Sequence, residues 1–419
     1  MKKAGAEVRR AAVAAMTSVT DRRQLLDVAL ARATAELDPP ERARASRLAT
    51  GALRWAGRSD RMLGPFLKRL PEDQVMNLLR LAVFEMFVEH SPAHAVVDQS
   101  VTLAPRGKAG LVNAVLRNVL RRGTDWNSLP LPSLPKWLRR RLVAAWGRDV
   151  VVAMEAEFAA GPMLDLTLRD AGDEESWARR LGASLRPDGG IRLPMARQVS
   201  GLPGYADGAW WVQDAGAAVA ARVLDARSGE AVLDLCCAPG GKTLQLAASG
   251  AAVTALDVSK ERMARVEENL VRTGLTATCI VADALNWTSQ GTFDAVLVDA
   301  PCSGTGTLRR HPDLVFVRDG SGIDELARLQ ARLIDRALVS LRPGGRLVFC
   351  TCSLLPEEGE DQVAAAVSRH SDVSIAVAVG DWIDARWRAR DGMLRIRPDH
   401  WRDEGGIDGF FVARLEKRP

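Results

Sequence analysis

Short apolar runs alternate with helical stretches through the second half of the chain, and this rhythm limits the possible folds more than any other feature. The apolar runs lie at residues 231–235, 253–256, 279–281, 295–298 and 347–349. Helical periodicity separates them, as at residues 260–273 and 323–341. Short buried strands that alternate with helices are typical of a parallel sheet covered on both faces. We therefore predict a doubly wound α/β domain over residues 208–419, with a late antiparallel strand at 409–415 on the sheet edge.

The first 125 residues have a helical pattern throughout. Apolar side chains recur at spacings of three and four, as at Leu48, Ala52 and Trp55, which is the period of an amphipathic helix. Proline interrupts the pattern at Pro39-Pro40 and at Ser91-Pro92, where helices are expected to end. Residues 1–125 are therefore predicted to form an all-α bundle.

A link rich in proline, leucine and serine follows at residues 125–135, and a short helical pattern resumes at Lys136. From Pro162 onward the pattern becomes mixed and rich in turns, with a clear turn at Asp188-Gly189-Gly190. We predict a connector over residues 126–207, made of a helix and a small α+β region. The chain has 419 residues, a length that accommodates these three domains.

Charge is distributed unevenly along the chain. Residues 1–150 contain 26 Lys and Arg against 14 Asp and Glu, a net charge of +12. The whole chain has a net charge of +5, so the remainder has −7. A basic surface binds polyanions such as nucleic acid, although a solvated arginine-rich surface would give the same count. If the partner is a nucleic acid, the N-terminal part is the part expected to bind it.

All six cysteines fall between Cys236 and Cys352, and their spacing matches neither a disulfide framework nor a zinc site. We expect free thiols, no metal and a reducing, cytoplasmic location. No run of about 18 apolar residues occurs, and the basic start is not followed by an apolar signal core. A membrane is therefore not an expected partner.

The segment after the first apolar run predicts a nucleotide-like cofactor. Ala238-Pro239-Gly240-Gly241-Lys242 gives a turn of small residues and the start of a helix, and such a turn lets the backbone approach a ligand closely. A dinucleotide-binding G-x-G-x-x-G motif is absent. A P-loop is also excluded, because the position of its first glycine holds Cys236.

Three aspartates follow successive predicted strands: Asp257, Asp283 and Asp299. Ligands of open α/β sheets bind at the carboxyl ends of the strands. There a carboxylate can accept hydrogen bonds from both hydroxyls of a ribose, as expected for Asp257, or from an adenine amino group, as expected for Asp283. A single aspartate of this kind is more often a helix cap, but three beside a glycine turn favour an adenosyl cofactor.

Two thiols occupy two further loops at the same predicted sheet edge. Cys302 lies in Asp299-Ala300-Pro301-Cys302-Ser303-Gly304-Thr305-Gly306, and Cys352 lies in Thr351-Cys352-Ser353. A thiolate that adds to an electron-poor ring makes the neighbouring ring carbon electron-rich. Two thiols beside a cofactor loop therefore indicate nucleophilic attack on such a ring.

These motifs together resemble the RNA cytosine-5 methyltransferase family, and within it the Sun/Fmu type that modifies small-subunit ribosomal RNA. The resemblance covers residues 205–415 and includes Trp211-Val212-Gln213-Asp214, Arg309-Arg310-His311-Pro312-Asp313 and Asp408-Gly409-Phe410-Phe411. The first 125 residues resemble, more loosely, the NusB-like RNA-binding domain at the front of that type. The resemblance implies a Rossmann-like catalytic domain and 16S ribosomal RNA as substrate. No obligate protein partner is evident from the sequence.

The resemblance also implies S-adenosylmethionine as cofactor. Its expected binding residues are Cys236, Cys237, Ala238, Pro239, Gly240, Gly241, Lys242, Asp257, Asp283 and Asp299. The resemblance makes Cys352 the nucleophile that attacks cytosine carbon 6 and Cys302 the residue that assists release of the product. Asp299 is also an expected catalytic residue, through a hydrogen bond to the edge of the base.

Three alternatives remain open from the sequence. DNA cytosine-5 methyltransferases attack with the thiol of a Pro-Cys loop, which would make Cys302 the nucleophile. Transfer RNA could replace ribosomal RNA as the substrate of the same chemistry. A non-catalytic RNA-binding assembly factor could retain the fold, although both thiols and all three strand-end aspartates are present.

Overall fold

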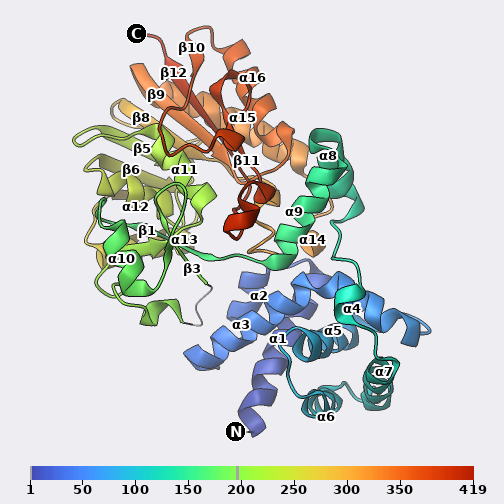
Figure 1. Cartoon of the computed structure of the whole chain (residues 1–419). Coiled ribbons are helices and arrows are strands. Elements are labelled where there is room, and N and C mark those ends of the chain that lie inside the picture. Colours follow the sequence, from blue (N-terminus) through green and yellow to red (C-terminus); the bar gives the residue numbers. More distant parts are fainter. Residues whose placement is uncertain (1, 195–197) are drawn as a thin grey trace. The chain divides into compact units, whose positions relative to one another are not determined.

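The computed structural model describes residues 2–194 and 198–419 and forms two compact units (Figure 1). The first unit consists of Met1–Gly161 and Leu308–Gly320, and the second of Pro162–Thr307 and Ser321–Pro419. This division does not coincide with the predicted boundaries at 125 and 207, because the connector is shared between the two units. Residues 195–197 of the predicted connector lie outside the described residues.

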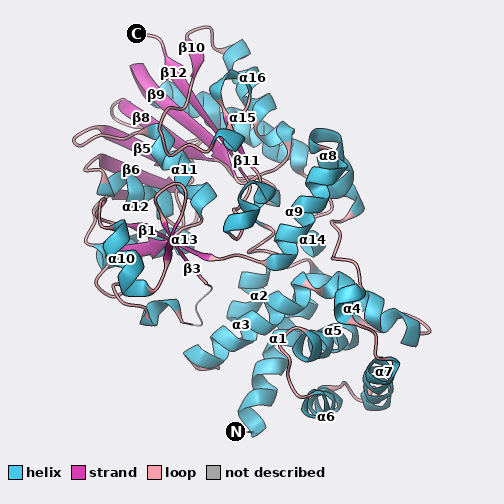
Figure 2. Cartoon of the chain, viewed as in Figure 1, coloured by secondary structure: helices cyan, strands magenta, loops and turns pink. Residues whose placement is uncertain are grey.

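The first unit is helical, as predicted for the N-terminal part (Figure 2). Its helices are α1 (Lys2–Arg22), α2 (Leu26–Ala33), α3 (Pro39–Arg54), α4 (Ala56–Leu63), α5 (Asp73–Phe87), α6 (Ala93–Leu103), α7 (Ala109–Arg122), α8 (Lys136–Trp146), α9 (Arg148–Ala160) and α14 (Leu314–Val317). Helix α5 is buried along most of its length and packs against α1 and α3. It forms the centre of this unit.

Two close contacts fix the helices around α5. The Arg9 guanidinium of α1 pairs with the buried Glu85 carboxylate at 2.8 Å between Nε and Oε2. A Cβ atom at Gly51 of α3 would lie 2.1 Å from the ring of Phe84, a distance at which the ring would have to move. Glycine at this position therefore allows α3 and α5 to approach each other.

Residues 308–320 follow the loop that contains Cys302, yet they pack within the first unit. Asp313 accepts a hydrogen bond from the Leu26 N–H at 3.0 Å, at the start of α2. Arg54 of α3 donates to the carbonyl of Arg309, and Trp137 of α8 donates to the carbonyl of Arg318 at 3.2 Å. The chain thus leaves the second unit after Thr307, enters the helical unit and returns at Ser321.

The second unit contains a small antiparallel sheet in the order β2-β3-β1-β4. Its strands are β1 (Leu164–Leu168), β2 (Ser184–Leu185), β3 (Ile191–Leu193) and β4 (Trp210–Val212), with α10 (Glu174–Leu181) beside them. This agrees with the expected α+β region. Residues of β4 continue through Gln213 and Asp214 into α11 (Ala215–Leu224), which leads to the large sheet.

The large sheet has the order β10-β12-β9-β8-β5-β6-β7, with β11 beside β12. Its strands are β5 (Ala231–Leu235), β6 (Ala252–Asp257), β7 (Thr278–Val281), β8 (Phe293–Asp299), β9 (Leu341–Thr351), β10 (Val373–Ala376), β11 (Leu394–Ile396) and β12 (Phe410–Lys417). The five neighbouring strands β7, β6, β5, β8 and β9 are parallel to one another. The late strand β12 is antiparallel, as predicted, but its predicted place at the edge is wrong because β10 pairs with its outer side.

Helices cover both faces of the large sheet, as the alternating pattern predicted. Along β5, Val232 packs on the face of α11, whereas Leu233 packs on the face of α15 (Ile323–Ser340) and α16 (Glu360–Arg369). Helices α12 (Gly241–Ala248) and α13 (Lys260–Thr273) pack on the same side as α11. The parallel strands of this doubly wound sheet therefore end together, and the loops that follow them form the candidate site.

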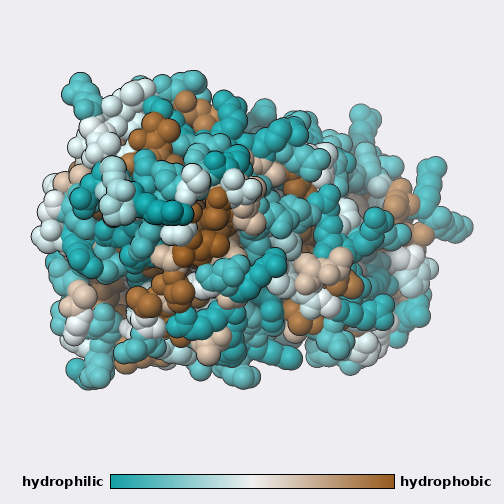
Figure 3. Space-filling model, turned by 90° about the horizontal axis from the view of Figure 1, so that it is seen from above, coloured by the Kyte–Doolittle hydropathy of each residue, from teal (hydrophilic) through white to brown (hydrophobic). Residues whose placement is uncertain are grey.

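The face of the molecule drawn in Figure 3 is mostly polar. In the view of Figure 3, hydrophilic residues cover most of the face, and the apolar patches between them are small. Among the described residues, no helix combines the length and the apolar composition that crossing a membrane would require.

Candidate functional site

The loop after β5 turns tightly before α12 begins. Cys236 adopts φ of +60° and Gly240 adopts φ of +104°, and the second value is unfavourable for any residue with a side chain. A Cβ atom at Gly240 would also lie 3.1 Å from the Val266 side chain. Glycine at position 240 is therefore needed for the fold of this loop, in addition to its predicted role of bringing the backbone close to a ligand.

Asp257 lies at the end of β6 and holds this loop in place. Its Oδ2 accepts a hydrogen bond from the Ala238 N–H at 3.1 Å, and its Oδ1 accepts one from the Ser259 N–H at 2.9 Å. Arg262 approaches Oδ2 at 3.5 Å. Each carboxylate oxygen can accept more than one hydrogen bond, so Asp257 retains capacity for ligand hydroxyls. The next residue, Val258, is 70% exposed.

Asp283 and Asp299 end up in different surroundings. Asp283 is exposed beyond β7 and accepts hydrogen bonds from the Leu285 N–H at 3.0 Å and from Asn286 at 2.6 Å. Asp299 ends β8, and its Oδ2 accepts a hydrogen bond from Lys242 Nζ at 2.7 Å. Burial opposes the charge of Lys242, but the neighbouring Asp299 outweighs it and raises the pKa of the ammonium group. Lys242 therefore carries a positive charge at this edge.

A fourth aspartate, Asp234, lies inside β5 and is fully buried. Its Oδ2 accepts a hydrogen bond from the Thr243 hydroxyl at 2.7 Å, whereas its buried Oδ1 has no hydrogen-bond partner. Burial, with the nearby carboxylates of Asp299 and Asp257, raises the pKa of Asp234 to about 7. Asp234 was not among the predicted site residues, because it lies within the strand that precedes the loop.

The two predicted thiols lie side by side. Cys302 Sγ and Cys352 Sγ are 3.4 Å apart, within the range of an S–H···S hydrogen bond. The hydrogen bond with Cys352 and burial raise the pKa of the Cys302 thiol well above its usual range. Cys302 therefore keeps its proton at neutral pH and stays a thiol beside Cys352. The pair thus offers one nucleophilic sulfur and one thiol beside it.

The other cysteines have less favourable surroundings for thiol chemistry. Burial raises the pKa of Cys236 to about 12, and it also raises the pKa values of Cys237 and Cys350. Thiols with raised pKa values are mostly protonated at neutral pH and are poor nucleophiles. Cys279 is half-buried on β7.

Backbone contacts lock the two thiol loops to the start of β12. The Gly306 N–H donates to the carbonyl of Cys352 at 2.8 Å, and the Gly409 N–H donates to the carbonyl of Gly306 at 2.8 Å. A Cβ atom at Gly306 would lie 2.0 Å from the Gly409 carbonyl oxygen. Glycine is therefore required here for the two loops and the late strand to meet.

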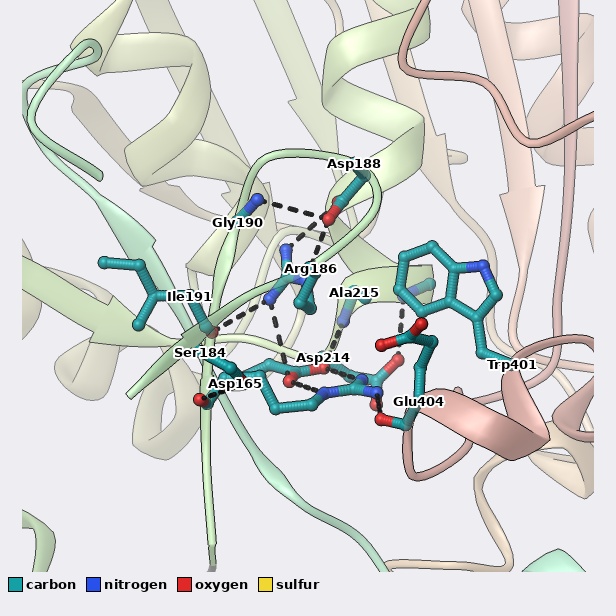
Figure 4. Close-up of polar contacts among 12 residues, drawn as sticks. Asp165, Ser184, Arg186, Asp188, Gly190, Ile191, Asp214, Ala215, Trp401 and Glu404 are labelled. Carbon is teal, nitrogen blue, oxygen red and sulfur yellow. Dashed lines mark hydrogen bonds and ion pairs between the residues drawn. The ribbon is translucent and has the colours of Figure 1, made fainter. Parts of the chain in front are cut away.

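A buried ionic network fixes the segment before β12 (Figure 4). Arg192 pairs with Asp165 at 2.6 Å and donates to the carbonyls of Glu404 and Gly406 at 2.6 and 2.8 Å. Asp165 Oδ2 also accepts a hydrogen bond from the Ala215 N–H at 3.0 Å. The small sheet thereby anchors both the start of α11 and the segment that leads to Gly409.

The network extends to a second buried pair. Arg186 donates to Asp188 at 2.9 Å, and the pairing outweighs burial to hold the pKa of that carboxylate below its usual range. Asp214 continues the anchoring, because its Oδ1 accepts hydrogen bonds from the Gly216 and Asp408 N–H groups at 2.8 and 3.1 Å. The Trp-Val-Gln-Asp motif therefore supports the site from α11.

Sequence reasoning assigned no role to Glu358, which lies in the 3-10 helix Pro356–Glu358 and contacts both thiol loops. A sequence signal for a shared anchor was present, because each candidate cysteine is followed directly by a serine whose hydroxyl can bind a common acceptor. No group of three or more His, Cys, Asp or Glu side chains in the described residues has an arrangement that could hold a metal ion.

Comparisons with known proteins match both parts of the chain. The family model described as 16S rRNA methyltransferase RsmB/F matches residues 221–416, and the NusB family model matches residues 6–121. Ribosomal RNA small subunit methyltransferase B of Pseudomonas syringae pv. tomato is 34% identical to the chain, and the alignment covers 98% of this chain and 96% of that protein.

Solved structures share the fold. The crystal structure of PH0851 superimposes with a TM-score of 0.77 at 22% identity, over 98% of this chain and 99% of that chain. NSun6 from Pyrococcus horikoshii with SFG gives a TM-score of 0.60 at 20% identity, over 69% of this chain and all of that chain. The predicted fold class is confirmed: a helical NusB-like front and a Rossmann-like sheet.

Proposed function

The chain belongs to the RsmB/F family of 16S rRNA methyltransferases, and we propose that it methylates carbon 5 of a cytosine in small-subunit ribosomal RNA. The observation that supports this chemistry best is the thiol pair, with Cys302 and Cys352 separated by 3.4 Å at the carboxyl edge of the sheet. One thiol suffices to activate a cytosine ring, whereas two adjacent thiols allow attack and release to be divided between them.

The proposed cofactor is S-adenosylmethionine, which supplies a methyl group bound to a positively charged sulfur. The residues proposed to hold it are the loop from Cys236 to Lys242 together with Asp257, Asp283 and Asp299. The local chemistry fits such a group, because the loop is made of small residues and the buried Asp234 Oδ1 lacks a hydrogen-bond partner. NSun6, a structure of the same fold, was solved with SFG, an analogue of S-adenosylmethionine.

Each acidic residue has a proposed role in this site. Asp257 would accept hydrogen bonds from the ribose hydroxyls, and the exposed Val258 beside it would pack against the adenine ring. Asp283 is exposed and lies near Asp257 at the same edge of the sheet. The residue before it, Ala282, donates its N–H to the Asp257 carbonyl at 3.1 Å. A carboxylate there can accept a hydrogen bond from the adenine amino group.

In the proposed reaction, the thiolate of Cys352 forms a bond to carbon 6 of the cytosine. The electrons of the ring double bond move toward carbon 5, which would then take the methyl group as the bond between that group and the cofactor sulfur breaks and leaves a neutral thioether. A base removes the proton from carbon 5, and the electron pair of that bond expels the Cys352 thiolate. Cys302 assists this elimination from 3.4 Å away.

Asp299 and Lys242 would act on the base rather than on the thiol. The Asp299 carboxylate would accept a hydrogen bond from protonated ring nitrogen 3 and so favour that protonation, which makes carbon 6 more electrophilic. Lys242 donates to Asp299 at 2.7 Å, so its charge orients the carboxylate and stabilises negative charge nearby.

The helical unit is the proposed RNA-binding part. Residues 6–121 match the NusB family model, and residues 1–150 have a net charge of +12. Phosphate contacts by such a surface give affinity that is largely independent of sequence. A cytosine inside a helix is out of reach of the thiols, so the target must be single-stranded or flipped out.

Methyl transfer from labelled S-adenosylmethionine tests this proposal. Unmodified 16S ribosomal RNA and transfer RNA are offered separately, and the nucleosides are identified by mass spectrometry. We expect 5-methylcytidine in the ribosomal RNA alone, and none with Cys352→Ala. Label in transfer RNA alone would contradict the substrate, and binding of the cofactor without any methyl transfer would favour a non-catalytic assembly factor.

A further inference from the structure

Each candidate cysteine is followed by a serine whose hydroxyl reaches the same buried carboxylate. The Ser353 hydroxyl donates to Glu358 Oε2 at 2.6 Å, and the Ser303 hydroxyl donates to that same oxygen. The Ser303 N–H also donates to Glu358 Oε1 at 2.8 Å. One side chain therefore holds both thiol loops at the residue next to each sulfur.

Glu358 is fully buried, with a relative exposure of 0%. A buried carboxylate is costly unless hydrogen bonds compensate for the lost water. Four donors do so here, because Gln330 Nε2 joins the two serine hydroxyls and the Ser303 N–H at 3.1 Å from Oε1. Gln330 also donates to the Pro301 carbonyl at 2.9 Å. The carboxylate thus ties the Cys302 loop to α15 as well.

The contacts around Glu358 connect two loops that leave different strands. Cys302 follows β8, and Cys352 follows β9. Thr305 Oγ1 bridges the loops by accepting a hydrogen bond from the Leu354 N–H at 2.9 Å. The serine hydroxyls themselves approach to 3.2 Å. Since Ser303 and Ser353 are covalently adjacent to the two cysteines, any displacement of the carboxylate is passed directly to the sulfurs.

We propose that Glu358 is a positioning residue that sets the separation between Cys302 and Cys352 and so allows one thiol to attack and the other to assist release. The inference rests on the proposed function for its catalytic meaning. The geometric part can be tested by itself: without the Glu358 carboxylate, the two thiol loops keep their backbone contacts but lose the shared anchor beside each sulfur. Glu358 touches neither sulfur, so it acts only through the serines.

A trivalent arsenical measures the thiol separation without cofactor or RNA. Phenylarsine oxide forms two As–S bonds with a thiol pair and releases its oxygen as water, which requires both sulfurs close to one arsenic atom. The full-length chain is titrated with it in the presence of a competing monothiol, and bound arsenic is read by intact-protein mass spectrometry. The arsenic that is bound by the unchanged chain but not by Cys302→Ser is the part held by the pair of Cys302 and Cys352.

We expect Glu358→Gln to weaken capture by about tenfold or more, since misplacing reacting groups by about 1 Å is already costly. Asp361→Asn, an exposed change three residues later, should leave it unchanged. Capture by Glu358→Gln at the strength of the unchanged chain overturns the inference, and so does failure of the unchanged chain to capture arsenic. Either result is independent of methyl transfer, so the two proposals fail separately.

A second variant guards against loss of folding. If Glu358→Gln no longer unfolds cooperatively, Ser303→Ala removes one hydroxyl contact while the Glu358 carboxylate and the Ser303 N–H contact remain. We expect a smaller loss of arsenic capture with unchanged binding of S-adenosylmethionine. In the methyl-transfer assay, a positioning role predicts that kcat falls while KM for RNA stays constant. Full arsenic capture by a folded Ser303→Ala overturns the inference.

Discussion

Lys242 Nζ donates a hydrogen bond to Asp299 Oδ2 at 2.7 Å and thereby joins the first turn of α12 to the end of β8. The two residues belong to separate sequence motifs that are 57 positions apart. The ion pair connects the loop proposed to hold the cofactor with the strand that leads to Cys302. The positive charge of Lys242 on the cofactor loop is therefore balanced by the negative charge of Asp299 at the end of β8.

Replacing Lys242 with Gln should reduce both stability and activity. Breaking a fully buried pair costs about 3–5 kcal/mol, but the Asp299 side chain is 29% exposed, so we expect a loss of about 1–3 kcal/mol in the free energy of unfolding. Loss of a preorganised charge should slow methyl transfer by about 10- to 100-fold. Urea unfolding and the methyl-transfer assay measure the two effects.

The matched control is Lys260→Gln, since Lys260 is exposed at the start of α13. Lys260→Gln should change neither the free energy of unfolding nor the rate of methyl transfer. An unfolding free energy for Lys242→Gln equal to that of the unchanged chain would contradict the importance of this pair.

The two thiols should differ in the covalent adduct that they leave with RNA. If Cys352 attacks and Cys302 assists release, Cys302→Ala should accumulate a protein–RNA adduct that survives denaturing electrophoresis. Cys352→Ala should form no adduct. Their separation of 3.4 Å makes either sulfur a possible nucleophile, so the reverse pattern would assign attack to Cys302, as in DNA cytosine-5 methyltransferases.

The sequence predicted the large sheet well, because its buried strands are apolar along their whole length and their spacing is regular. The carboxyl ends of those strands also placed the candidate residues Asp257, Asp299 and Cys352 at one edge. The position of β12 was wrong. Its antiparallel direction followed from its late place in the chain, but the pairing of β10 beyond it depends on contacts between distant segments.

Other features had no local signal. Residues 308–320 pack in the helical unit because Asp313 caps α2 and Leu308, Pro312 and Phe316 contribute apolar surface, and periodicity cannot show such long-range packing. Glu358 lies next to Glu357, and no local pattern in the sequence indicates that this carboxylate is buried. Its burial follows only from the convergence of two loops whose strands are neighbours in the sheet.

Stability should fall with rising pH because of Asp234. Burial raises the pKa of this carboxyl to about 7, whereas in the unfolded chain it ionises near pH ~4. Between these values the unfolded chain releases a proton that the folded chain keeps, so the unfolded state gains stability as pH rises. Asp234→Asn removes this effect, and its stability relative to the unchanged chain should increase by up to about 1.4 kcal/mol per pH unit.

Urea unfolding at pH 5, 6 and 7 measures this difference. Two histidines act in the opposite direction, since loss of hydration lowers the pKa of the buried His400 to about 4 and also lowers the pKa of His311. Both remain in the variant, so the difference between the two chains isolates Asp234. Parallel curves for the two chains would show that Asp234 is ionised in both the folded and unfolded states.

The helical unit should not tolerate a methyl group at Gly51. The added Cβ would lie 2.1 Å from the Phe84 ring, and relief of such overpacking costs about 1–3 kcal/mol. Gly110→Ala is the matched control, because nothing lies within 4 Å of its Cβ position at the exposed start of α7. Thermal unfolding should show destabilisation for Gly51→Ala and an unchanged or slightly raised midpoint for Gly110→Ala.

RNA affinity should depend on salt through exposed arginines of α7. Arg117 and Arg121 hydrogen-bond to the neutral side chains of Asn113 and Asn118 at 2.8 and 3.2 Å, so these contacts leave their charges available for phosphates. Each phosphate contact contributes about 0.7–0.9 to the slope of log affinity against log salt. The double variant Arg117→Gln, Arg121→Gln should therefore lower that slope by about 1–2.

Arg227→Gln provides the comparison, because Arg227 is equally exposed but lies 3.6 Å from the carboxylate of Asp225 in the second unit. Removal of an arginine that is already paired with an acid should leave the slope unchanged. Binding of 16S ribosomal RNA measured by filter retention between about 50 and 200 mM salt supplies both slopes. Equal slopes for the double variant and the unchanged chain would mean that α7 does not face RNA, and the positive charge of the helical unit would then have to act through other helices.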